Sequence, residues 1–194
     1  RAYGNSSFGQ DLGLQMYPKA SFSWVMSDES FWGDGWGQMK VRAAYGQSGR
    51  APGAFDAVRT WNPIGWGGSP AYRPMNLGNP DLGPERTTEF ETGFDGSFLN
   101  DRLVMAFTYF HQKTNDALFN VSQIPSQGFL GSQLANVGEL MNNGIEASVT
   151  ATFIDREDWA WDVGVNLSTN HSEVLDLGGA AEFSIGNYGW IVEG

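Results

Sequence analysis

Three closely spaced carboxylates, Glu89, Glu91 and Asp95, have the types and spacing that could do chemistry in this chain. Side chains an even number of positions apart on an extended strand point to the same side, so these three would line up along one face. Two carboxyl groups that flank a glycosidic bond can act as general acid and general base. That role needs a closed pocket in which the two pKa values are pushed apart, and one strand does not provide it. We therefore expect no catalytic residue and no enzymatic activity.

The two histidines, His111 and His171, lack a second ligating side chain at the spacing that zinc sites use. They are typical of polar residues near strand ends. The chain has no cysteine, which removes any disulfide framework and any Cys-based metal site. We expect no metal and no cofactor.

A loop rich in Gly and Pro carries the better candidates for ligand binding: Trp61, Trp66, Tyr72 and Arg73. Aromatic rings offer apolar faces to sugar C–H groups, and a guanidinium offers a rigid fork of donors to a carboxylate such as a peptide terminus. The alternative is that Trp61 and Trp66 pack the loop against the mouth of the structure. The turn residues between the two rings fit both interpretations.

The alternation around the carboxylates predicts the element that positions them. Glu89, Glu91, Gly93 and Asp95 would point one way, and the opposite side would carry Thr88, Phe90, Thr92, Phe94 and Phe98. The same period of two recurs over residues 39–45, 145–153 and 159–167. Such runs approach the roughly 9 to 11 residues that a tilted strand needs to cross a bilayer, whereas soluble strands are usually nearer 5 or 6.

This pattern indicates an all-β fold, an antiparallel transmembrane β-barrel with lipid outside and water inside. The polar side chains expected to face the lumen are Lys40, Arg42, Glu89, Glu91, Asp95 and Glu146. Lys40, Arg42 and Arg86 are the expected partners of the carboxylates. We predict about seven strands, and these cover residues 17–26, 38–47, 86–98, 103–112, 116–121, 143–154 and 159–171. A further strand is expected near Tyr188.

The predicted connections alternate in length. Short turns at residues 99–102 and 155–158 fit the periplasmic side of such a barrel, and the segments 49–85 and 122–143 fit long extracellular loops without a sustained period. Aromatic residues gather next to the short turns, as in the girdles at a membrane interface: Trp24, Phe31, Trp32, Trp36, Phe98, Trp159 and Trp161.

Composition excludes two classes of protein. The formal net charge of −11, with only 11 Lys and Arg, argues against a nucleic-acid partner. No apolar run is long enough for a membrane-spanning helix. The chain starts without an initiator Met or a signal segment, and its last residues look like the start of another strand, so we expect an interior piece of a longer chain. An open sheet with lipid-facing edges is not viable in a bilayer, and further strands must close it.

The residues carry a resemblance to the TonB-dependent outer-membrane receptors, and within them to the SusC/RagA group. The matching positions are Asn79, Pro80, Asp81, Leu82, Glu85, Thr88, Gly93, Gly144 and Glu146, together with the segment 98–103. The chain departs from many SusC-like sequences by carrying Gly83 and Pro84 in place of a Lys-Trp pair.

The resemblance implies a barrel of roughly 22 strands in the outer membrane of a Gram-negative bacterium. Residues 1–194 would be part of this single barrel domain, while the plug domain, the signal peptide and the C-terminal strand would lie outside them. The barrel would import a nutrient such as a glycan or a peptide, with energy from the TonB–ExbB–ExbD complex. A SusD-like surface lipoprotein would contact the two long loops. The alternatives are a passive outer-membrane porin or adhesin barrel and a soluble carbohydrate-binding β-sandwich module.

Overall fold

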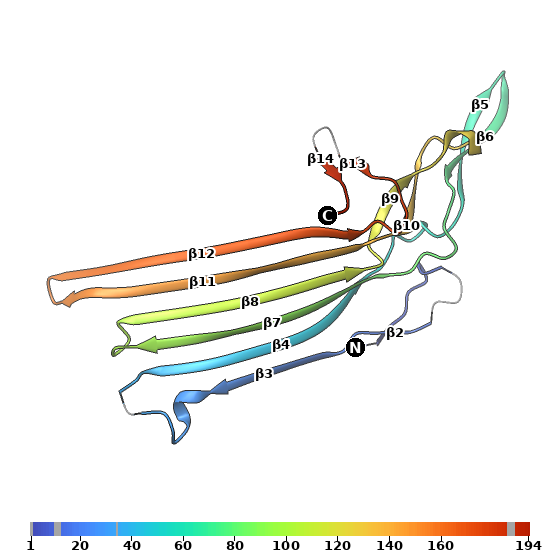
Figure 1. The fold of residues 1–194 in the computed structure, drawn as a ribbon. Helices are drawn as coiled ribbons and strands as arrows, with labels where there is room; N and C mark the ends of the chain where they lie inside the picture. Colours follow the sequence, from blue (N-terminus) through green and yellow to red (C-terminus); the bar gives the residue numbers. More distant parts are fainter. Residues whose placement is uncertain (1, 10–12, 34, 186–188) are drawn as a thin grey trace.

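The computed structural model describes residues 2–9, 13–33, 35–185 and 189–194. Its main element is a six-stranded antiparallel sheet in the order β3-β4-β7-β8-β11-β12 (Figure 1). The strands are β3 (Lys19–Val25), β4 (Gln38–Arg50), β7 (Glu85–Phe98), β8 (Leu103–Asn115), β11 (Glu139–Arg156) and β12 (Trp159–Asp176). Among the described residues, no helix has the length and apolar character needed to cross a membrane.

The connections at the two ends of the sheet differ as predicted (Figure 1). At one end, residues 99–102 join β7 to β8 and residues 157–158 join β11 to β12. The first of these turns places Leu99, Asn100 and Asp101 at positive φ, a conformation that Asn and Asp tolerate well. The β3–β4 connection at the same end contains a short 3-10 turn, η1 (Met26–Asp28).

The long connections at the other end contain hairpins of their own. β5 (Thr60–Trp66) pairs with β6 (Ser69–Asn76), and β9 (Leu118–Ser122) pairs with β10 (Ser132–Asn136). A second 3-10 turn, η2 (Pro125–Gln127), lies between β9 and β10. Short pairs β1 (Ala2–Tyr3) with β2 (Gln15–Met16) and β13 (Phe183–Ile185) with β14 (Gly189–Ile191) complete the loop end.

Two strand predictions need correction. The segment 116–121 is not a wall strand, because its ordered part is β9, which pairs with β10 outside the main sheet. The segment 116–121 alternates like the strands of the main sheet, but β9 has only 5 residues, which are too few to cross a bilayer. The loops 49–85 and 122–143 were expected to lack a sustained period, yet the first holds the β5–β6 hairpin and the second holds β10 and the first residues of β11. Tyr188, near the further predicted strand, lies outside the described residues.

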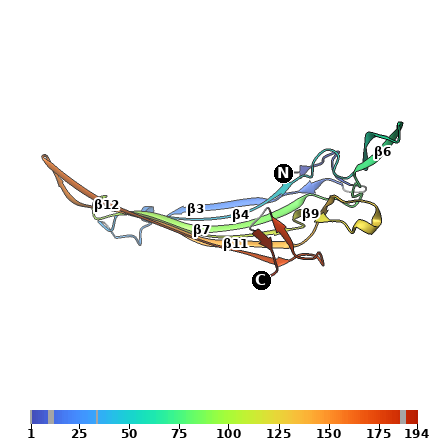
Figure 2. The ribbon, with the colours of Figure 1, turned by 90° about the horizontal axis from the view of Figure 1, so that it is seen from above.

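The register of the strands divides the main sheet into two faces. One continuous row of directly paired residues runs through Val41, Phe94, Phe107, Ala147 and Leu167. The adjacent row, on the other side of the sheet, runs through Arg42, Gly93, Thr108, Glu146 and Ser168. We call the first side the apolar face and the second the polar face. Figure 2 shows that the sheet is bowed rather than flat.

Trp24 and Trp161, two aromatic residues at the turn end, are offset from each other along the strand direction. The register row of Trp24 on β3 reaches β12 at Leu167, whereas Trp161 lies six residues nearer the turn. That offset is about 20 Å along the strand, across five strand spacings of about 24 Å in total. If Trp24 and Trp161 lie at one membrane interface, the strands tilt by about 40°, which is within the range of outer-membrane barrels. The projection of the β11–β12 hairpin beyond its neighbours (Figure 1) then follows from the tilt.

Spin labels can test this tilt in the full-length protein reconstituted in bilayers. Labels at Trp24→Cys and Trp161→Cys are expected to report the same membrane depth, because the tilt compensates for their offset in register. A label at Leu167→Cys should lie about 15 Å deeper in the hydrocarbon. Depth is measured from the accessibility of each label to oxygen and to a water-soluble nickel complex. Equal depths for positions 24 and 167 would contradict the tilt.

Gly93 is a second point at which the fold can be tested. A Cβ atom at Gly93 would overlap the backbone carbonyl oxygen of Phe107 on β8, whereas a Cβ atom at Gly46 would meet only the Lys19 side chain at 3.7 Å. Gly93→Ala is expected to destabilise the barrel by about 1 to 3 kcal/mol, because the two strands must move apart. Gly46→Ala serves as the matched control. Denaturant unfolding of the full-length protein, followed by heat-modifiable gel migration, measures the difference, and equal midpoints for the two variants would disprove the close approach.

Candidate functional site

Three charged residues of the polar face, Lys40, Arg42 and Asp95, form an ion-pair cluster near the turn end. Asp95 on β7 accepts from Lys40 Nζ at 3.0 Å and from Arg42 Nε at 3.4 Å. Arg42 Nη2 also donates to Thr108 Oγ1 at 2.6 Å, so this cluster bridges β4, β7 and β8. The predicted pairing of Lys40 and Arg42 with a carboxylate is confirmed. The side chains are partly exposed, so the cluster contributes little stability by itself.

Arg86 does not join this cluster, and its predicted pairing with these carboxylates is wrong. As an even-numbered residue of β7 it lies on the opposite side of the strand from Glu89 and Glu91. Its guanidinium donates to Gln15 Oε1 at 2.8 Å and lies 5.8 Å from the centre of the Tyr17 ring. Arg86 therefore fastens the loop end of β7 to the segment that precedes β3.

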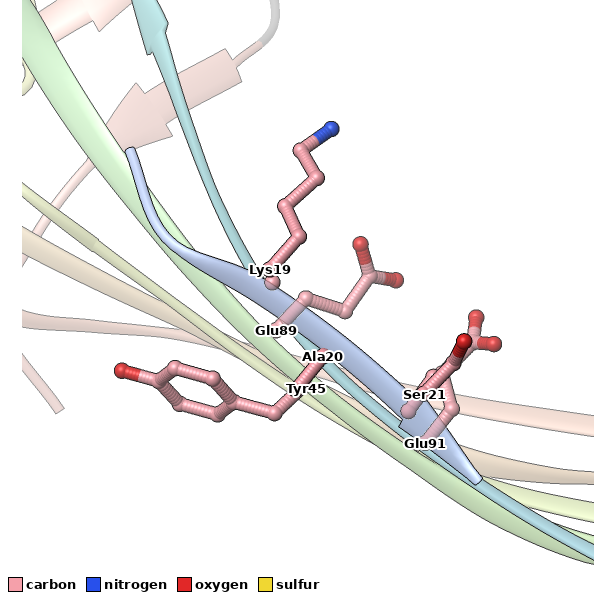
Figure 3. Close-up of a pocket in the computed structure, with 8 residues that line it drawn as sticks. Lys19, Ala20, Ser21, Tyr45, Glu89 and Glu91 are labelled. Atoms are coloured by element: carbon pink, nitrogen blue, oxygen red, sulfur yellow. The ribbon is translucent and has the colours of Figure 1, made fainter. Parts of the chain in front are cut away.

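The other carboxylates of the polar face are not neutralised by the part of the chain that the structure describes. Glu89, Glu91 and Glu146 have no ion-pair partner there. Figure 3 shows Glu89 and Glu91 projecting from the same side of the sheet as Lys19, while Tyr45 projects from the other side. They border a shallow hollow of about 360 Å³. A second hollow, of about 450 Å³, is bordered by Glu146 and Arg42.

Within the described residues, no group of three or more His, Asp or Glu side chains is close enough to share a metal ion. His171 Nε2 lies 3.6 Å from Glu173 Oε2. His111 lies in the same register row as His171, with Asn143 between them.

The predicted binding residues all lie on the β5–β6 hairpin, but the strand pairing separates them into two sets. Trp61 pairs with Pro74, and Tyr72 pairs with Pro63, so both rings lie on one side of the hairpin. Trp66 and Arg73 lie on the other side. Trp66 is 77% exposed and Tyr72 is 72% exposed. The structure therefore does not bring the four residues into one site, and Trp66 does not pack the loop against the mouth.

The family-signature residues at the loop end have a structural role that the sequence did not reveal. Asn79 Oδ1 accepts from the backbone N–H of Asp81 at 3.1 Å, which fixes a turn at Pro80. Leu82 is completely buried, and Glu85 Oε2 accepts from the backbone N–H of Leu118 at 3.3 Å. The signature segment thus connects the first long loop to the start of the second.

Two amides on β10 complete this connection and were missed at the sequence level. Asn136 Nδ2 donates to the carbonyl oxygens of Gly83 and Asp116 at 2.9 Å each, and its Oδ1 accepts from the Gly83 N–H at 2.6 Å. Gln133 donates to the carbonyl oxygen of Gly78. Asn79 Nδ2 donates to the carbonyl oxygen of Leu134 at 3.3 Å, and we call Asn79, Gln133 and Asn136 the loop clasp. Nothing in the local sequence distinguishes these two β10 amides from the other amides of a polar loop.

The remaining signature residues lie in the sheet. Thr88 accepts from Gln47 Nε2 at 3.2 Å, on the side of β7 opposite the carboxylates. Gly93 and Gly144 stand where β7 and β11 approach a backbone carbonyl of the next strand, of Phe107 and Thr169 respectively. Their role is to allow this approach, which a side chain would block.

Comparison with known proteins places this geometry in a family. The family model for the TonB dependent receptor-like β-barrel matches residues 3–190. The chain is 35% identical over 189 residues to TonB-dependent receptor P26 of Formosa agariphila, covering 92% of this chain and 19% of that protein. It is 29% identical over 188 residues to TonB-dependent receptor SusC of Bacteroides thetaiotaomicron, covering 91% of this chain and 19% of SusC.

Solved structures agree on the fold. The RagAB peptide importer in its closed-closed state superimposes with a TM-score of 0.82 at 23% identity, over 94% of this chain and 20% of that one. The RagAB peptide importer in its open-open state gives a TM-score of 0.76 at 25% identity, over 95% of this chain and 20% of that chain. The chain spans about a fifth of the length of the relatives that it matches. It belongs to the TonB-dependent receptor family, as a segment of the β-barrel that is similar to SusC and RagA.

Proposed function

We propose that this segment forms part of the wall of an outer-membrane receptor that imports a nutrient, such as a glycan or a peptide, with energy relayed by the TonB–ExbB–ExbD complex. The observation that carries the proposal is the division of the sheet into an apolar and a polar face along strands long enough to cross a bilayer. β4 has 13 residues and β12 has 18. The apolar face would contact lipid, and the polar face would line an aqueous lumen.

A soluble β-sandwich does not fit these observations. Many large side chains of the apolar face are exposed in the described structure, among them Tyr45 at 41%, Phe90 at 43% and Val165 at 61%. Within the described residues, no second sheet covers them. A soluble module would leave this patch in water, and a membrane wall would place it in lipid. Family membership points to the same conclusion.

The unneutralised carboxylates favour an occupied lumen over an open pore. Glu89, Glu91 and Glu146 lie on the polar face without a cationic partner in the described residues, in contrast to Asp95. We infer that a plug domain elsewhere in the full-length protein presents Lys or Arg side chains to them. A passive porin or adhesin barrel would leave the same carboxylates in water.

The long loops supply a surface for a surface lipoprotein. Large apolar side chains on both loops are exposed, among them Phe55 at 70%, Trp66 at 77% and Leu130 at 88%. RagAB, which shares the fold, is described as a peptide importer. For the present chain, a SusD-like lipoprotein would cover these loops and close the extracellular mouth.

Growth experiments test the transport proposal. Deletion of the gene and disruption of tonB are each expected to abolish growth on the cognate nutrient, because energy-coupled import needs both. Growth is compared on a panel of single glycans and peptides at micromolar supply. If the tonB strain still grows on the nutrient while the deletion strain does not, the barrel is a passive pore.

The plug contact is tested by removing charge from the wall. The double variant Glu89→Gln and Glu91→Gln in the full-length receptor is expected to loosen the plug, since each charge-assisted hydrogen bond contributes about 1.5 to 3 kcal/mol. Looser seating should increase the entry of large antibiotics that the outer membrane normally excludes. Glu157→Gln, at the exposed β11–β12 turn, is the matched control. Antibiotic sensitivity equal to that of the control and of the wild type would count against the plug contact.

A further inference from the structure

A groove between the two long loops has the features of a ligand site. It has a volume of about 310 Å³ and lies between the β5–β6 hairpin and residues 128–131 of the second loop. Asn62 and Arg73, a directly opposed cross-strand pair, line it from the hairpin. The other side chains that line it are apolar: Pro74, Met75, Phe129 and Leu130.

The walls of the groove are fixed by hydrogen bonds at their base. Asn76, at the end of β6, donates to the carbonyl oxygens of Phe55 at 2.9 Å and of Val58 at 3.2 Å. The loop clasp then ties Gly78 to Gln133, two residues beyond the end of the 128–131 segment. These bonds brace the base of the groove, and a groove that is held in shape lowers the entropic cost of binding.

Arg73 is the charged residue of the groove, and its guanidinium is available to bind a ligand. Its guanidinium has no hydrogen-bond or ion-pair partner within the described residues. The other described arginines of the first long loop are engaged, because Arg50 lies 3.9 Å from Glu85 Oε1 and Arg59 donates to the carbonyl oxygen of Leu77 at 3.3 Å. Arg73 thus offers a free fork of donors beside an apolar surface, a combination that fits a carboxylate next to an apolar group.

We propose that this groove binds the carboxyl terminus of an oligopeptide whose last side chain is apolar. Arg73 would hold the carboxylate, the Asn62 amide would contact the peptide backbone, and the terminal side chain would lie against Met75, Phe129 and Leu130. This proposal rests on the proposed import function and names a class of substrate for it.

The lining favours a peptide over an acidic sugar. A sugar ring is usually held by several hydrogen-bonding groups and an exposed aromatic face, but among the described residues only Asn62 and Arg73 line the groove with polar side chains. The exposed rings of Trp61 and Tyr72, which could stack on a sugar, lie on the opposite side of the hairpin, and Trp66, on the side of Arg73, is not among the residues that line the groove. The ring of Phe129 in the groove is only 8% exposed, so it does not offer an exposed aromatic face to a sugar.

Calorimetric titration of the full-length receptor in detergent tests the proposal. The probes are an uncharged hexapeptide ending in Leu with a free carboxylate, the same hexapeptide as its C-terminal amide, and a hexamer of glucuronate. The free-acid peptide should bind at least about tenfold more tightly than the amide, as expected for one charge-assisted contact. Arg73→Gln should remove this difference, and Tyr72→Ala, on the other side of the hairpin, should retain it.

Two results would overturn the inference. One is equal affinity for the acid and the amide in the wild-type receptor. The other is tighter binding of the glucuronate hexamer than of the free-acid peptide, with loss of that binding in Arg73→Gln. Neither result affects the TonB dependence of growth on the cognate nutrient, so failure of the peptide site is distinguishable from failure of the import function. A fold defect in Arg73→Gln is recognised from its heat-modifiable gel migration.

Discussion

The satisfaction of backbone hydrogen bonds in hydrocarbon is the constraint on which the rest of this structure depends. Lipid offers no partners to N–H and C=O groups, so a sheet can cross the membrane only when every strand is paired and the sheet closes on itself. The backbone groups of the six strands pair with one another through an antiparallel register, which is irregular at two points between β11 and β12. At the β12 edge, the Gly194 N–H donates to the Val174 carbonyl oxygen at 3.1 Å, so the chain returns to that edge after β14.

The same constraint explains where the variable parts of the protein lie. In the main sheet, the register and the close approaches at Gly93 and Gly144 leave little freedom to change the sequence or the spacing of the strands. Beyond the membrane, water can satisfy the backbone, and the two long connections carry hairpins that stand apart from the sheet. The loop clasp fixes these hairpins at their base, so that exposed side chains are presented on a firm frame. A binding surface on loops and a rigid barrel wall are thereby compatible in one chain.

Sequence reasoning succeeded where period and length decide the structure, and it failed where a contact joins distant segments. The alternation around Glu89 and Phe90 predicted the faces of β7, and the pairing of Asp95 with Lys40 and Arg42 followed from shared faces on adjacent strands. The position of Arg86 was open to the same argument, since parity alone places it away from Glu89. By contrast, the contacts of Asn136 with Gly83 cross 53 positions, and no local pattern indicates them. The separation of Trp61 from Arg73 likewise depended on the register of a hairpin that the loop composition concealed.

Cysteine accessibility along β7 distinguishes a membrane wall from a sheet that water reaches on both faces. Single cysteines are placed at residues 88–95 of the full-length receptor in outer membranes, without other cysteines, and each is treated with a small water-soluble thiol reagent. For a membrane wall we expect labelling with a period of two. The odd positions, which include Glu89, Glu91 and Asp95, should be labelled, and the even positions, which include Phe90 and Phe94, should be protected. Labelling of both sets to the same extent would show that water reaches both faces and would contradict a membrane wall.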